Sequence, residues 1–159
     1  MANPFAPGAP RGFFYEDFRV GMVMESASRT VTEADILTFA GHSGDFTPIH
    51  LDDRFARASI YGERIAHGLM GLVFAQGLIS MTAHVWDSGV ASIGWNNWQF
   101  KAPLRIGATV RARWTLTARR ESGSRPGMGI ITEFVELVDQ DGQVIQQGEH
   151  VTMVRKRAA

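Results

Sequence analysis

The chain of 159 residues contains no cysteine, no excess of either charge and no long uninterrupted apolar run. The lack of cysteine excludes disulfides, thiolate nucleophiles and cysteine-based zinc sites. Sixteen Lys and Arg balance sixteen Asp and Glu, whereas a nucleic-acid-binding protein normally carries a basic excess. We therefore expect no nucleic-acid partner, and the missing cysteines fit a reducing compartment, so we expect a cytoplasmic protein.

The N-terminal segment and the longest apolar stretch both argue against a membrane protein. Residues 1–12 are rich in Pro, Gly and Ala and lack the basic start and apolar core of a signal peptide. We expect a flexible arm there, followed by a single domain over residues 13–159. Residues 68–83 are mostly apolar but are interrupted by Gln76, Ser80 and Thr82, and are too short for a membrane span.

The first half of the chain predicts one strand followed by helices. Residues 20–31 suggest a strand broken near Gly21, and Thr32 with Asp35 matches a helix capping box. The helix that follows should end between residues 41 and 44, where two glycines occur. Its expected inward face consists of Ala34, Leu37 and Ala40.

Two further helices are expected before the chain turns to strands. Residues 44–51 contain a proline and should not form a regular helix, whereas a short helix should run from Asp52 to Ser59. His67 and Gly68 should open a long helix to about Trp86. Because that helix is apolar nearly all round, we expect it to be buried on all sides.

The second half of the chain predicts antiparallel strands. Residues 110–119 alternate apolar and polar side chains, which is typical of a strand with one buried face. Further strands are expected at residues 92–101, 130–138 and 143–154, with a hairpin turn at Asp141 and Gly142. A buried helix needs a sheet to cover it, so the expected fold is α+β, with a curled antiparallel sheet around one central helix. That is the hot-dog fold.

The candidate catalytic residues lie between residues 39 and 51. Asp45 and His50 lie five residues apart in an irregular loop, next to the apolar Phe46 and Ile49. Apolar walls would raise the pKa of a carboxyl group toward neutrality, which suits a general base. The spacing alone leaves open an ordinary turn, in which Asp45 caps its own backbone.

The segment Gly44-Asp45-Phe46-Thr47-Pro48-Ile49-His50 resembles the signature of the MaoC-like, (R)-specific enoyl-CoA hydratases, which reads Gly-Asp-x-Asn-Pro-aliphatic-His. The segment Ala66-His67-Gly68-Leu69-Met70 is similar to the His-Gly segment that begins the central helix of that family. The resemblance extends from about Phe14 to Val154. Thr47 departs from the signature, which has Asn at this position.

The resemblance implies a role for each matching residue. Asp45 and His50 would hold the water that attacks C3 of a 2-enoyl thioester and would manage the proton at C2, with Asp45 as the base toward water. The backbone N–H of Gly68 would be the oxyanion donor, because an N–H at a helix N-terminus stabilises an anion. We expect Phe46, Ile49 and His67 to contribute to substrate binding, with His67 holding the start of the helix.

The expected function is therefore the reversible hydration of a 2-enoyl thioester, carried by coenzyme A or by acyl carrier protein. Two alternatives stay open: a hot-dog acyl-thioester hydrolase, and a catalytically weak acyl-binding subunit, which the Thr47 exchange favours. No His-x-x-x-His spacing suggests a metal, no nucleotide fingerprint suggests a cofactor, and His84 and His150 are expected to be structural. The family pairs its domains, so we expect a homodimer or higher homo-oligomer, with residues 92–101 contributing to the contact.

Overall fold

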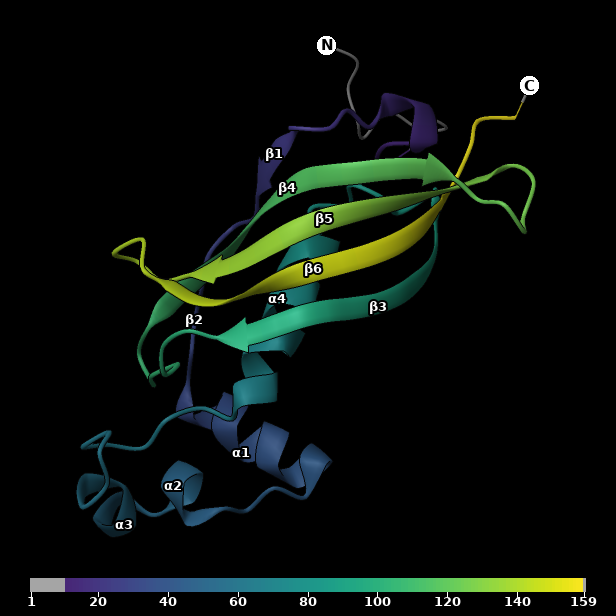
Figure 1. Ribbon diagram of the computed structural model, residues 1–159. Helices are drawn as coiled ribbons and strands as arrows, with labels where there is room; N and C mark the ends of the chain where they lie inside the picture. The colour runs from purple at the N-terminus through teal and green to yellow at the C-terminus, as the bar shows by residue number, and fades with distance from the viewer. Residues whose placement is uncertain (1–10, 159) are drawn as a thin grey trace.

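The computed structural model describes residues 11–158, in which a strongly curved sheet lies against one long helix, with smaller helices beyond one end of the sheet (Figure 1). The short N-terminal elements are η1 (Tyr15–Asp17), β1 (Val23–Glu25) and β2 (Arg29–Thr30). The helices are α1 (Glu33–Ser43), α2 (Pro48–Leu51), α3 (Asp53–Arg57) and α4 (Gly68–Met81). The long strands are β3 (Gly89–Phe100), β4 (Thr109–Glu121), β5 (Met128–Val138) and β6 (Val144–Arg155).

The sheet is antiparallel, with strand order β1-β4-β5-β6-β3, and β2 also pairs with β4. The four long strands predicted from the second half of the chain are all present, and β4, predicted from its alternation, buries Val110, Ala112, Trp114 and Leu116 as expected. The predicted strand over residues 20–31 is present as two short strands. Among residues 11–158, strand β3 pairs with β6 alone and therefore forms one edge of the sheet.

The helix α4 contributes the centre of the main core, through Met70, Phe74, Ala75, Leu78 and Ile79. The predicted burial on all sides is wrong for this chain by itself, because Leu69, Val73 and Met81 are exposed on the other face. The helix also ends at Met81 and not near Trp86, since Thr82 is its C-cap. The central helix of the predicted hot-dog arrangement is otherwise confirmed.

The capping box that begins α1 is confirmed, with Thr32 and Asp35 each bonding the backbone of the other. The predicted inward face is confirmed for Ala40 but wrong for Ala34 and Leu37, which are exposed, while Ile36 is buried instead. Helix α1 lies beyond the end of the sheet, at the same end of the molecule as α2 and α3 (Figure 1), and reaches the main core through Ile36 and Phe39.

The predicted flexible arm, residues 1–12, lies outside the described residues except for Arg11 and Gly12. The flexibility of the arm stays a prediction, although both of these residues make close contacts. The backbone N–H of Arg11 donates to Asp87 (2.6 Å), and Gly12 packs so closely on the 83–84 backbone that a Cβ would lie 2.4 Å from the carbonyl oxygen of Ala83. Within the described part of the chain, no helix combines the length and hydropathy needed to cross a bilayer.

A buried ionisable cluster joins β5 and β6 to the segment after α4. Glu133 is fully buried, with its carboxylate 3.3 Å from Nε2 of His84 and 3.8 Å from Nδ1 of His150. Burial would raise the pKa of Glu133, but the His150 and His84 side chains together outweigh it and lower the pKa. Both histidines are therefore built into the core, which agrees with the structural role expected for them.

Candidate active site

The loop between α1 and α2 is shaped by one glycine and one proline. Gly44 caps α1 in the left-handed conformation, with φ +75°, which glycine adopts without steric cost. Pro48 occupies the first position of α2, where its missing N–H removes no hydrogen bond. The expectation that residues 44–51 form no regular helix is wrong for Pro48–Leu51, which form the single helical turn α2 with the proline as its first residue. These two residues place Asp45 and His50 on either side of a sharp change in chain direction.

Thr47 holds the carboxylate of Asp45. Its hydroxyl donates to Oδ1 (2.5 Å) and its backbone N–H donates to the same oxygen (3.1 Å). These two hydrogen bonds lower the pKa of Asp45 below its usual value. The expectation that apolar neighbours raise this pKa is wrong, because Asp45 is exposed in the single chain. The hydroxyl of Thr47 also shows how a residue other than Asn can brace the loop.

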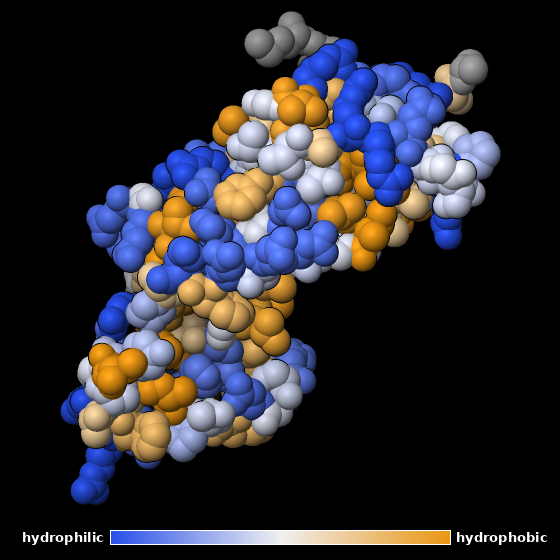
Figure 2. All heavy atoms as spheres, viewed as in Figure 1, coloured by the Kyte–Doolittle hydropathy of each residue, from blue (hydrophilic) through white to orange (hydrophobic). Residues whose placement is uncertain are grey.

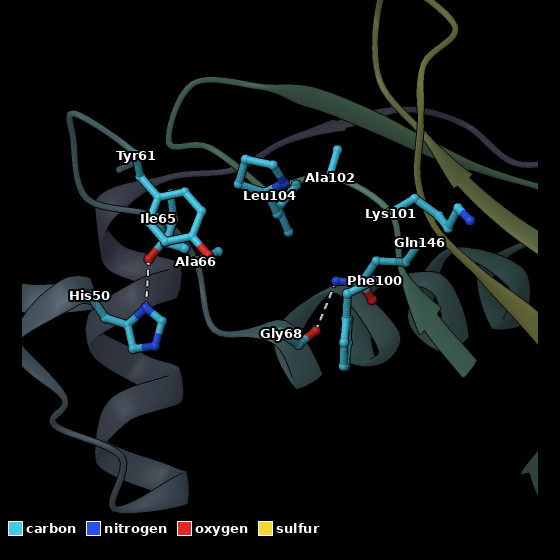
Figure 3. A pocket seen from close by; sticks show the side chains of 11 residues that line it. His50, Tyr61, Ile65, Ala66, Gly68, Phe100, Lys101, Ala102, Leu104 and Gln146 are labelled. Carbon is cyan, nitrogen blue, oxygen red and sulfur yellow. Dashed lines mark hydrogen bonds between the residues drawn. The ribbon is translucent and has the colours of Figure 1, made fainter. Parts of the chain in front are cut away.

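The imidazole of His50 is buried and fixed in one orientation. Its Nδ1–H donates to the carbonyl oxygen of Ile65 (2.8 Å), because a carbonyl can only accept (Figure 3). In the neutral ring, this bond leaves Nε2 with a free lone pair. The His50 ring is thus prepared to accept a proton from a group placed opposite Nε2.

His67 links the two halves of the site. Its Nε2–H donates to the carbonyl oxygen of Asp45 (2.9 Å), and its ring stacks on that of His50 with centroids 3.9 Å apart. It is also the N-cap residue of α4, although its side chain makes no capping bond. His67 therefore fixes the Asp45 loop, and it does not hold the helix start through its side chain as expected.

A cavity of about 350 Å³ opens beside these residues (Figure 3). His50 and Gly68 both line it, from different elements of the fold. As the first residue of α4, Gly68 has no intrahelical acceptor for its N–H. The other lining residues are Tyr61, Ile65, Ala66, Phe100, Lys101, Ala102, Pro103, Leu104 and Gln146. Figure 2 shows apolar surface in the hollow between the sheet and the α1–α3 end.

The structure brings together most, but not all, of the residues predicted for the site. A carboxylate oxygen of Asp45 and ring nitrogens of His50 and His67 lie within 4.8 Å of one another. The three residues offer ligands for a cation, although one nitrogen of each imidazole already binds a backbone carbonyl. Phe46 is exposed and Ile49 is half-buried, and neither lines the cavity. Their contact with substrate stays a prediction.

The cavity walls from the second half of the chain were missed by the sequence reasoning. Phe100 and Lys101 lie where β3 ends, in a segment without a chemical motif. Gln146 left no signal either, because its face of β6 also carries Gly148, His150 and Thr152, and only the structure shows that this face is buried.

Comparisons with known proteins agree with this geometry. A family model described as MaoC like domain matches residues 17–136. The chain is 34% identical to an (R)-specific enoyl-CoA hydratase of Rhodospirillum rubrum over 145 residues, which cover 91% of this chain and 93% of that protein. The crystal structure of a MaoC-like dehydratase from Rhodospirillum rubrum matches with a TM-score of 0.84 and 30% identity, over 93% of this chain and 100% of that one.

A Mycobacterium tuberculosis protein described as having a double hot-dog fold matches with a TM-score of 0.78, over 92% of this chain and 45% of that one. At 17% identity this likeness supports the fold alone. The family match spans the loop of Asp45, the ring of His50 and the start of α4. The chain therefore belongs to the MaoC-like domain family and has the hot-dog fold.

Proposed function

We propose that the protein catalyses the reversible hydration of a 2-enoyl-CoA to a 3-hydroxyacyl-CoA. The observation that carries this proposal is the position of His50 and Gly68 on one cavity, with the carboxylate of Asp45 within 4.8 Å of the His50 ring. The relative from Rhodospirillum rubrum, an (R)-specific enoyl-CoA hydratase, supports the same reaction.

The separation between Asp45 and His50 suits one water molecule that bonds to both side chains. The water oxygen adds to C3 of the enoyl group, and one proton of the water passes to the Asp45–His50 pair. The pair returns a proton to C2, so the enzyme ends the reaction in its starting protonation state. Because the two groups interact, we assign the proton transfers to the pair and not to either residue alone.

Addition at C3 moves negative charge onto the thioester oxygen. The N–H of Gly68, at the N-terminus of α4, is placed to bind that oxygen as charge develops. Glycine lets the thioester approach the backbone closely. The cavity of about 350 Å³ is near the lower end for small-molecule sites, so we propose that short acyl groups are preferred.

We also propose that two copies of the chain pair in solution. Leu69 and Val73 of α4 are more than half exposed, as is Ile93 of the edge strand β3. An unpaired strand edge beside an exposed apolar helix face is usually covered in a stable protein. Trp95 and Trp98 of β3 contact the core, so the exposed residues of the strand would make the contact.

The test is a hydration assay over 2-enoyl-CoAs of graded length, followed by the loss of absorbance of the conjugated thioester. We expect turnover, with short chains preferred. Release of free thiol from a saturated acyl-CoA, without hydration, would identify a hydrolase instead. Binding of acyl-CoA without turnover of any substrate would identify a binding subunit.

A further inference from the structure

Gln146 is a buried amide in the wall of the cavity, and both ends of that amide are bonded. Its Nε2–H donates to the carbonyl oxygen of Gly68 (2.9 Å; Figure 3). Its Oε1 accepts from the indole N–H of Trp98 (2.9 Å). Only 2% of Gln146 is exposed. A buried amide costs free energy unless it is bonded, and an apolar residue would fill this space without that cost. The presence of a buried amide at position 146, in place of an apolar side chain, therefore needs a physical reason.

The structure around Gln146 leaves its side chain little choice of position. Gly71, one turn after Gly68, has no side chain where the amide lies: a Cβ there would be 2.2 Å from Nε2 of Gln146. On the other side, a bulge in β3 between Asn96 and Gln99 contains Trp98. A β-bulge changes the direction in which a side chain of the strand points. Here the indole N–H of Trp98 points to the amide oxygen of Gln146 and donates a hydrogen bond to it.

We infer that Gln146 is a positioning residue, which sets the direction of the Gly68 N–H toward the thioester oxygen. Gly68 has no side chain to restrict its own φ and ψ angles. The hydrogen bond from Gln146 on β6 holds the peptide group that follows Gly68. Because this group is joined to the Gly68 N–H through the φ and ψ angles of Gly68, holding it limits the directions in which the N–H can point. A donor that is fixed before the reaction stabilises developing charge at no cost of reorganisation.

This inference rests on the proposed hydratase function, and it predicts a loss in kcat and little change in binding. Gln146→Met keeps the length of the side chain but removes both hydrogen bonds. We expect kcat to fall on the order of 10- to 100-fold, the scale of a small misplacement of a reacting group. The Kd for a saturated acyl-CoA such as butyryl-CoA should change little, because the cavity keeps its volume.

The variant Gln146→Glu tests whether Gln146 positions the Gly68 N–H or only stabilises the fold. Its ionised carboxylate cannot donate to the carbonyl oxygen of Gly68, whereas the protonated acid can. Burial favours the protonated form, which raises the pKa of such a carboxyl group. The ratio of variant kcat to wild-type kcat should therefore rise as the pH falls. For Gln146→Met, and for the matched control Gln147→Met on the opposite face of β6, the ratio should be independent of pH.

The outcomes distinguish the inference from the proposed function. No hydration by the wild type would overturn the proposed function itself. An active wild type together with a folded Gln146→Met that keeps wild-type kcat would overturn the positioning role, as would a slow Gln146→Glu whose kcat ratio stays constant with pH. If Gln146→Met does not fold, Trp98→Phe removes the indole N–H together with part of the ring but keeps Gln146 itself, and an unchanged kcat in that variant would also contradict the inference.

Discussion

The N–H of Gly68 can be removed with little other change, because the structure places this residue where proline is tolerated. Gly68 is the first residue of α4, the helical position that proline prefers. The preceding residue, His67, has φ −59° and ψ 139°, the extended conformation that a following proline requires. Gly68→Pro should therefore fold, although it lacks the proposed oxyanion donor.

Gly68→Ala is the matched control, because it adds a Cβ and keeps the N–H. That Cβ would lie 3.2 Å from Cε1 of Phe100, so the ring must move by only a few tenths of an ångström. We expect a modest loss of activity for Ala. For Pro we expect a further loss of about 100- to 1000-fold in kcat, the scale for one oxyanion donor.

The two variants should be compared in the hydration of the best 2-enoyl-CoA, with circular dichroism and thermal unfolding as folding controls. The ratio of the two rates isolates the N–H, since both variants carry a Cβ. A folded Gly68→Pro enzyme that is as fast as Gly68→Ala would show that this N–H does not stabilise the transition state.

Three further predictions follow from the contacts described above. Thr47→Val removes the hydroxyl that lowers the pKa of Asp45, so the acid limb of the kcat/KM profile should move to higher pH, and an unmoved limb would contradict the assignment. Glu133→Gln should lower the free energy of unfolding by about 1–3 kcal/mol in urea titrations, because it leaves the buried imidazoles of His84 and His150 without their carboxylate partner. Since the folded-state pKa of Glu133 is lowered, wild type keeps this stability above about pH 4.5 and loses it as pH falls through the folded-state pKa, so the difference should persist at neutral pH and shrink in acid. Val73→Glu should convert the expected dimer to a monomer by light scattering, and a wild type that is already monomeric would refute the pairing.

Local patterns in the sequence were sufficient for most of the elements, whereas the two proposed catalytic residues came from the family resemblance and remain a proposal. The capping box at Thr32 and the alternation along β4 depend on neighbouring residues, and both are confirmed. The buried face of α1 was predicted wrongly, because it depends on where the helix meets the sheet. Ile36 points to the core, and Leu37 does not.

The hydrogen bonds of the candidate active site were also not predictable from the sequence. A sequence places Asp45 among apolar residues, but it does not show that Thr47 folds back to bond the carboxylate. Likewise, Gln146 lies 78 residues from Gly68, and their contact exists only because β6 passes beside the start of α4. Long-range contacts of this kind determine pKa values and cavity walls, and one sequence does not reveal them.

The most direct test of the proposed mechanism is the rate of hydration in Asp45→Asn, His50→Gln and the double variant. Both residues lie in or beside a loop, and we expect folding to be retained by circular dichroism. Each single variant should lose roughly 100-fold or more in kcat, the scale of general acid–base groups. Because the two act on one water, the double variant should be about as slow as the slower single. A folded Asp45→Asn enzyme with more than about a tenth of wild-type kcat would contradict the mechanism.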